Sequence, residues 1–254
     1  MIEKIINTLR NQGVTILTRK AFLLIKAKLC SITPNKFKII FMAKIRDFKS
    51  EDIDTMFDFS FTFLRGFIRP MQIKEEFKNL LKIFKKYPNK IILEIGTANG
   101  GSLFHLCKLA PDDALIISID LPEGNFGGGY PKWKEPIYKL FKKKNQRLYL
   151  LREDSHQEET LLKIKEILNN KKIDFLFIDG DHGYDGVKKD FKMYSPLVKE
   201  GGIIAFHDIT PNGLEKLTGG VPIFWREIKD KYEHEEFIQD QKQTGYGIGY
   251  LINK

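Results

Sequence analysis

Cysteine is scarce in this sequence of 254 residues, which contains only Cys30 and Cys107. Two cysteines argue against a disulfide framework and suit a reducing cytoplasm. No CxxC pair and no Cys/His spacing typical of a zinc site is present. We therefore expect a cytoplasmic protein that is not stabilised by disulfides or by a zinc finger.

Long uncharged apolar runs are also missing. No run reaches the length of about 18 residues that a transmembrane helix needs. The N-terminus is not typical of a signal peptide, because Arg19, Lys20, Lys26 and Lys28 interrupt its apolar runs and no small-residue cleavage site follows. The sequence predicts a protein that is cytoplasmic or lies on the inner face of a membrane.

Most of the chain lacks an excess of basic charge, although the net charge is +9. Residues 1–50 contain eleven Lys or Arg against Glu3 and Asp47, which accounts for the whole excess. The remaining 204 residues carry 31 basic and 31 acidic side chains. A body without a basic field is not typical of nucleic-acid binding, so we expect no nucleic-acid partner.

Residues 1–68 are predicted to form a basic, helical N-terminal extension. In residues 1–32, apolar and basic side chains recur at helical spacing, and Gly13 divides this pattern into two predicted helices. Basic amphipathic helices can lie in a membrane interface. They can equally pack against the body or a second subunit, so peripheral membrane contact and a homo-oligomer both stay open. The Phe-rich residues 47–70 are predicted to be irregular or to form short helices.

From residue 69 onward, apolar strand-forming runs alternate with helical patterns. The predicted strands are 90–95, 114–120, 147–151, 173–179, 202–207 and 247–252, and the predicted helices are 72–88, 101–109, 136–144, 158–169, 186–197 and 221–232. This alternation predicts a parallel sheet covered on both faces. Ligands bind beyond the carboxyl ends of such strands, so the residues that follow each strand are the candidates for function.

A glycine-rich turn, "GTANGG", follows the first predicted strand. Glycines let the backbone turn sharply and approach a ligand, and the next helix offers free N–H groups. Gly96, Thr97 and Gly100 are therefore candidate cofactor-binding residues, and Glu94 would lie near a positively charged ligand group. The spacing differs from the G-x-G-x-x-G of dinucleotide-binding folds, which disfavours an NAD-dependent enzyme. A merely tight strand–helix turn is the alternative.

Polar residues also follow the second and third strands. Asp120, 24 residues beyond Gly96, is placed to accept both hydroxyls of a ribose. Asp154 and Ser155 are suited to the edge of an adenine ring. Asp154 can also cap the helix that follows, and the two roles are compatible.

Five segments in order resemble a class I S-adenosylmethionine-dependent methyltransferase: "ILEIGTANGGS", "IISIDLP", "REDSH", "IDFLFIDGDHGYDGVKKDF" and "GGIIAFHDI". More narrowly, they are similar to the enzymes that act on macrolide and polysaccharide sugars and to cephalosporin-hydroxylase-like proteins. The resemblance covers residues 69–254. It implies an α/β, Rossmann-like, doubly wound and mainly parallel seven-stranded sheet with an antiparallel C-terminal edge strand.

The resemblance also implies S-adenosylmethionine as the cofactor. Its methionine part would lie at Gly96 and the following turn, its ribose at Asp120, and its adenine at Asp154 and Ser155. These are the residues that the strand ends single out.

The fourth and fifth strands lead into two Asp/His pairs, Asp179 with His182 and His207 with Asp208. Asp179, which is also a candidate cofactor contact, His207 and Asp208 are candidate ligands for Mg²⁺ or another divalent metal. The sugar enzymes resembled here have an acidic pair where this chain has His207–Asp208. Histidine favours Mn²⁺, Fe²⁺ or Zn²⁺ over Mg²⁺, so the identity of the metal and the need for one stay open. A buried structural role for His207 is the alternative.

Asp179 and His182 are the candidate catalytic residues. A cation at Asp179 could bind two adjacent sugar hydroxyls and lower the pKa of one of them. Neutral His182 could then accept the proton as a general base. In the resembled sugar enzymes, an Asp-x-x-His pair matches these two residues.

The sequence therefore predicts an S-adenosylmethionine-dependent O-methyltransferase that acts on a sugar hydroxyl of a glycoconjugate, polysaccharide or secondary metabolite. We expect the acceptor to be a small molecule or a glycan. The loop 124–136 is long enough to be a lid, and its Tyr130 and Trp133 could stack on a sugar ring or on the adenine; a plain surface loop is the alternative. Two alternatives stay open: a hydroxylase-like protein of the same fold, and a non-catalytic module that binds the cofactor. The Asp/His cluster argues against the second alternative.

Overall fold

The computed structural model describes residues 35–122, 129–211, 213 and 219–254. The chain divides into two compact units, residues 1–48 and residues 49–254. In the first unit the helix α2 spans Asn35–Arg46, whereas the two predicted helices of residues 1–32 lie outside the described residues. The predicted functional boundary at residue 69 stays a prediction. Within the described ranges, no helix combines the length and the apolar character needed to cross a membrane.

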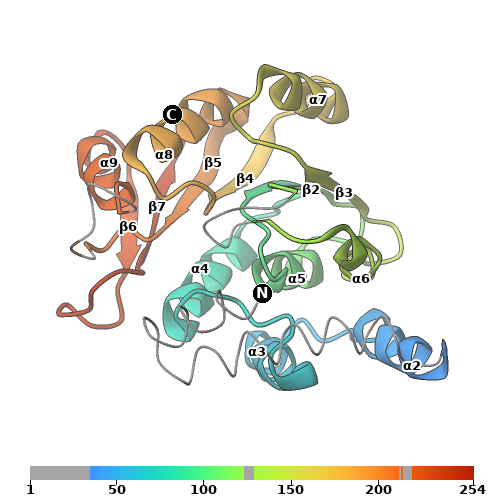
Figure 1. Ribbon diagram of the computed structural model, residues 1–254. Coiled ribbons are helices and arrows are strands. Elements are labelled where there is room, and N and C mark those ends of the chain that lie inside the picture. The colour runs from blue at the N-terminus through green and yellow to red at the C-terminus, as the bar shows by residue number, and fades with distance from the viewer. Residues whose placement is uncertain (1–34, 123–128, 212, 214–218) are drawn as a thin grey trace, which may run out of the picture. The chain divides into compact units, whose positions relative to one another are not determined.

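A seven-stranded sheet forms the centre of residues 49–254 (Figure 1). Its strands are β1 (Ile91–Ile95), β2 (Leu115–Asp120), β3 (Arg147–Arg152), β4 (Ile173–Ile178), β5 (Val198–His207), β6 (His234–Phe237) and β7 (Ile248–Ile252). The order is β3-β2-β1-β4-β5-β7-β6, with the first five strands parallel and β7 antiparallel to both of its neighbours. The predicted Rossmann-like fold is confirmed. β6 is an addition that the sequence did not predict, and it places β7 second from the edge.

Helices cover both faces of the sheet (Figure 1). They are α3 (Ile53–Thr62), α4 (Lys74–Lys86), α5 (Gly101–Leu109), α6 (Glu135–Tyr138), α7 (Glu158–Leu168), α8 (Tyr184–Tyr194) and α9 (Val221–Ile228), with short 3-10 turns η1 (Phe63–Arg65), η2 (Lys132–Lys134), η3 (Ser195–Leu197) and η4 (Lys229–Lys231). On one face, Phe77 of α4 stacks on Phe177 of β4 with ring centroids 6.2 Å apart. On the other face, α7, α8 and α9 bury apolar side chains in one core cluster with the strands. The helix predicted over 136–144 is much shorter, because α6 ends at Tyr138.

The helix α4 connects the start of this unit to its C-terminal part. Glu76 is almost fully buried, and its carboxylate accepts hydrogen bonds from the backbone N–H groups of Gln239 and Gly247 and from the side-chain amide of Gln243. A buried carboxylate is tolerated because these three donors satisfy it. Glu76 therefore fixes residues 239–247 against α4.

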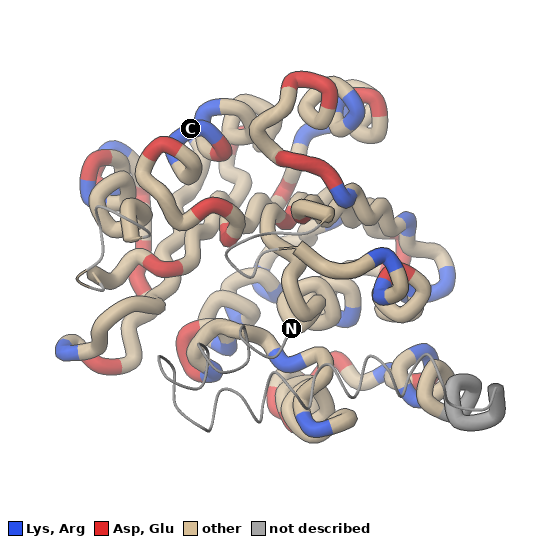
Figure 2. The backbone as a smooth tube through the Cα atoms, viewed as in Figure 1, with Lys and Arg blue, Asp and Glu red and all other residues tan. Residues whose placement is uncertain are grey.

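Charged side chains are interspersed over the unit of residues 49–254. Figure 2 shows basic and acidic positions alternating along its helices and loops. Such mixing produces no broad field of one sign. The absence of a nucleic-acid partner stays a prediction.

The glycine turn after β1 is shaped by the close approach of β4. Gly96 has a φ of +102°, and a Cβ built on it would lie 2.0 Å from the carbonyl oxygen of Asp179. Gly100 has a φ of +74°, and its Cβ would lie 2.7 Å from the ring of Tyr138. Both positions need glycine, for its left-handed backbone and for the missing side chain. The turn lies at the carboxyl ends of adjacent strands, where ligands bind in this fold.

We predict that Gly96→Ala destabilises the protein by about 3 kcal/mol, since it combines backbone strain with a clash against main-chain atoms. Gly201→Ala is the matched control, because Gly201 also has a positive φ of +71° but has no atom within 4 Å of the Cβ position. The control should cost about 1 kcal/mol. Urea unfolding of the two variants measures the difference, and equal losses would refute the close approach at Gly96.

Candidate active site

Asp179 is held rigidly at the end of β4. Its backbone N–H donates to the carbonyl of Ile95 at 2.8 Å. Its carboxylate accepts hydrogen bonds from Gln72 Nε2 at 2.5 Å and from His207 Nδ1 at 2.9 Å. Gln72 and His207 are both buried, so they fix the orientation of the Asp179 carboxylate.

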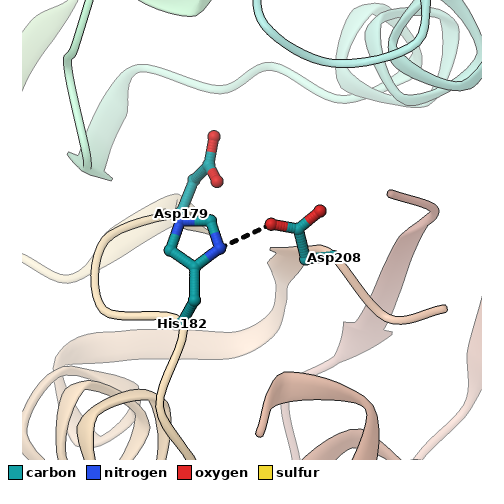
Figure 3. Close-up of side chains that lie close together, drawn as sticks. All are labelled: Asp179, His182 and Asp208. Carbon is teal, nitrogen blue, oxygen red and sulfur yellow. Dashed lines mark ion pairs between the residues drawn. The ribbon is translucent and has the colours of Figure 1, made fainter. Parts of the chain in front are cut away.

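Three side chains converge beside this carboxylate. Asp179, His182 and Asp208 each offer one ligand atom, and these atoms lie within 4.8 Å of one another (Figure 3). His182 Nδ1 lies 2.6 Å from Asp208 Oδ2, while the other oxygen of Asp208 accepts the backbone N–H of Tyr246 at 3.1 Å. Two carboxylates and one imidazole fit a divalent cation, and the imidazole favours Mn²⁺, Fe²⁺ or Zn²⁺ over Mg²⁺.

His207 lies outside this group of three. Its Nδ1 donates to Asp179, and its Nε2 is buried without a hydrogen bond among the described residues. Burial acts to lower the pKa of His207, but the charge and hydrogen bond of Asp179 outweigh it and raise the pKa. The arrangement suits a residue that orients Asp179. The prediction that His207 itself binds a metal stays untested, and the geometry puts His182 in its place.

His182 is protonated at neutral pH in this arrangement. The hydrogen bond to Asp208 raises the pKa of His182 to about 9, against the opposing effect of burial. A protonated imidazole cannot accept a proton, so this arrangement does not favour His182 as a general base, and its catalytic role stays a prediction. A cation bound by His182 would displace that proton, because metal ligands must be deprotonated.

Glu94 is fully buried beneath the glycine turn. Burial raises its pKa to about 8, although the hydroxyl groups of Ser102 and Ser118 lower it. Ser118 Oγ donates to Glu94 Oε2 at 2.6 Å and is itself 2.5 Å from the hydroxyl of Thr97. A cationic ligand group near Glu94 would favour its ionised form and bring this pKa down. Thr97 thus belongs to the network that supports the turn.

Asp120 ends β2 and holds the same turn from the other side. Its carboxylate accepts backbone N–H groups from Ala98 at 2.6 Å and from Leu121 and Gly129 at 2.8 Å. Burial raises the pKa of Asp120, and these hydrogen bonds oppose the shift. A carboxylate has about four acceptor positions. Two ribose hydroxyls can bind there only if one of the three N–H groups gives way.

Asp154 and Ser155, which follow β3, make hydrogen bonds that order the turn before α7. Asp154 accepts hydrogen bonds from the backbone N–H of His156 and from the side chain of Gln157, both at 2.8 Å. Burial acts to raise the pKa of Asp154, but these bonds outweigh it and lower the pKa. The backbone carbonyl of Ser155 accepts the hydroxyl of Tyr194 at 2.6 Å. Asp154 therefore orders the turn before α7, and adenine binding by both residues stays a prediction.

In the predicted lid, Tyr130 is buried against the protein, whereas Trp133 is exposed. Tyr130 is almost fully buried and packs on Tyr138, with ring centroids 4.9 Å apart. Trp133 is 39% exposed and lies 6.0 Å from the ring of Phe67. Residues 123–128 lie outside the described residues, so contact with an acceptor stays a prediction.

The sequence interpretation missed Gln72. It belongs to the "IRPMQ" segment before α4, which resembled the family but carried no recognisable chemistry. Only its hydrogen bond to Asp179, 107 residues away, connects it to the site.

Part of the chain is similar to a known protein family. Residues 93–209 match the model of a family described as a methyltransferase domain. This segment contains the glycine turn and the three residues Asp179, His182 and Asp208. The match covers a little under half of the chain, and over this segment the chain is similar to that family.

Two curated relatives are similar to about half of this chain. Caffeoyl-CoA O-methyltransferase of Medicago sativa is 28% identical over 141 residues, which cover 55% of this chain and 53% of that protein. An uncharacterized protein of Acanthamoeba polyphaga mimivirus, R132, is 33% identical over 131 residues, or 52% of this chain and 56% of that one. The chain spans about half the length of both relatives. The first names a caffeoyl-CoA enzyme, so the narrower resemblance to sugar enzymes stays a prediction.

Solved structures share the fold of this chain. The O-methyltransferase TomG from Streptomyces achromogenes, solved with S-adenosylmethionine, is 16% identical with a TM-score of 0.55, and the match covers 82% of this chain and 92% of that one. An O-methyltransferase from Bacillus cereus, solved with S-adenosylhomocysteine, is 13% identical with a TM-score of 0.52 and covers 91% and 97%. At these identities the likeness establishes the fold.

The His182–Asp208 pair leads to a pH prediction. In EDTA, the pKa of His182 measured by NMR titration should be about 9 in the wild type and should fall most in Asp208→Asn, because Asp208 is its main cause. Asp181→Asn, which removes a weaker charge effect, should lower it less. Since the folded pKa is raised, the stabilisation is complete below pH 6.5 and is lost as the pH rises through 9. Equal shifts in both variants would contradict the assigned cause.

Proposed function

We propose that this protein is an S-adenosylmethionine-dependent O-methyltransferase assisted by a divalent cation. The observation that supports it is the contact between Gly96 and Asp179. The carbonyl oxygen of Asp179 fills the space beside the glycine turn, while its carboxylate belongs to the group of three. A methyl donor on the turn and a cation on the carboxylate would therefore be neighbours.

The residues present fit both groups. Gly96 and Gly100 have no side chains, so a ligand can approach the backbone of the turn. The buried Glu94 carboxyl suits a cationic ligand group. Asp179, His182 and Asp208 would hold the cation. When bound, S-adenosylmethionine supplies a methyl group activated by its sulfonium, and the cation supplies positive charge that favours loss of a proton from a nearby hydroxyl.

The protein's own contribution is orientation. Gln72 and His207 hold the Asp179 carboxylate in one position, and the Tyr246 N–H holds Asp208. Because these carboxylates are fixed, a cation that they bind would hold the acceptor oxygen in one position relative to the methyl group. The transferred methyl group is already activated, so this alignment supplies most of the rate enhancement.

The acceptor carries two adjacent hydroxyl groups, since a cation can bind both at once. The motifs at the strand ends favour a sugar of a glycoconjugate, polysaccharide or secondary metabolite. The named relative favours a catechol such as caffeoyl-CoA. A hydroxylase-like protein or a cofactor-binding module is the alternative if no methyl group is transferred.

Calorimetric titration with S-adenosylmethionine, with and without EDTA, is the first test. We expect micromolar binding in both conditions. Transfer of a labelled methyl group to a panel of sugar diols and catechols should then need Mg²⁺, Mn²⁺ or Zn²⁺ and stop with EDTA. Absence of cofactor binding would overturn the proposal, and binding without transfer to either acceptor class would favour the non-transferring alternatives.

Two substitutions separate cofactor binding from turnover. Asp120→Ala should weaken S-adenosylmethionine binding by at least about tenfold, because a charge-assisted hydrogen bond is lost. His182→Ala should keep cofactor affinity within about twofold but lose about a hundredfold or more in turnover, as expected for a lost metal ligand. Asp113→Ala is the control, since Asp113 is exposed near the start of β2. Normal cofactor binding by Asp120→Ala would contradict the ribose assignment.

A further inference from the structure

Lys134 lies at the candidate active site but has no role in the proposed methyl transfer. It ends η2 and lies over the glycine turn, where its Nζ donates to Asn99 Oδ1 at 3.3 Å. The same ammonium lies 5.6 Å from the ring centroid of Phe67 and 5.9 Å from that of Tyr138. Tyr138 in turn donates its hydroxyl to the carbonyl of Ala98. Lys134 is thus connected to the turn through two of its residues.

No carboxylate of the described residues lies within ion-pair distance of Lys134. Its partners are one amide oxygen and two aromatic faces, and burial lowers its pKa to about 8 even though Asp120 acts to raise it. Withdrawing an ammonium group from water without an anionic partner is costly. An anion that binds here would recover that cost.

A buried donor without a partner among the described residues contacts the same tyrosine as this ammonium. Tyr130 packs on Tyr138, and its hydroxyl is buried with no hydrogen bond among the described residues. Its side chain is only 1% exposed. Lys134 and Tyr130 therefore both contact Tyr138. Lys134 has one neutral acceptor, Asn99, and the Tyr130 hydroxyl has none among the described residues, although a buried donor normally has one.

We propose that Lys134 binds the α-carboxylate of the cofactor's methionine part. The inference rests on the proposed function, because the turn that Lys134 covers is the one assigned to this part of S-adenosylmethionine. The carboxylate is the one anionic group of that molecule, and an ammonium held at the turn by Asn99 is complementary to it. Lys134 is then a specificity-determining residue that separates amino-acid cofactors from their decarboxylated analogues.

Ligand analogues test this assignment directly. Calorimetry compares S-adenosylmethionine, decarboxylated S-adenosylmethionine and 5′-methylthioadenosine, which lacks the amino-acid part. The wild type should prefer the intact cofactor over the decarboxylated one by about tenfold to a hundredfold, the range for a hydrogen bond to a charged group. Lys134→Met should lose this preference while its affinity for 5′-methylthioadenosine stays within about twofold, which also shows that the variant is folded.

Lys132→Met is the matched control, because Lys132 is exposed in the same short turn. It should keep the wild-type preference, and Lys134→Arg should keep most of it. If Lys134→Met still distinguishes the two cofactors, or changes only the KM of the acceptor, the assignment is overturned. If the wild type binds none of the three ligands, the proposed function itself fails.

Discussion

Asp179 is fixed where β1 and β4 lie side by side, and the site depends on that position. Its N–H pairs with Ile95, its carbonyl oxygen occupies the space that a side chain at position 96 would need, and its carboxylate is held by Gln72 and His207. One residue thus shapes the glycine turn with its backbone and the group of Asp179, His182 and Asp208 with its side chain. Neither feature can move without the other, because adjacent parallel strands are rigidly hydrogen-bonded.

Acidic side chains gather at the carboxyl edge of the sheet. Glu94, Asp120, Asp179 and Asp208 all lie at or just beyond the ends of their strands. Burial raises the pKa of Glu94 and Asp120, whereas the hydrogen bond and charge of the histidines lower that of Asp208 in spite of burial. A site of this kind gains stability when a sulfonium, an ammonium or a divalent metal enters it.

The fold was predictable from the sequence because its strands are continuous apolar runs bounded by turn residues. β6 was missed because "HEEF" is charged, and its pairing with β7 rather than its own pattern makes it a strand. At the site, the strand-end rule found Asp120 and Asp179 by position alone. It could not find Gln72 or Lys134, which reach the site from segments before β1 and after β2 and whose roles depend on tertiary contacts. It also could not foresee that Asp208 would keep His182 protonated.

The buried Glu76 has a consequence for the order in which the chain folds. Its three hydrogen-bond partners lie 163, 167 and 171 residues further along the sequence. Until those residues arrive, α4 must bury an unsatisfied carboxylate or leave it in water, and closing loops of such length is entropically slow. During synthesis, the Glu76 carboxylate therefore gains all three of its hydrogen-bond partners only after residue 247 has left the ribosome.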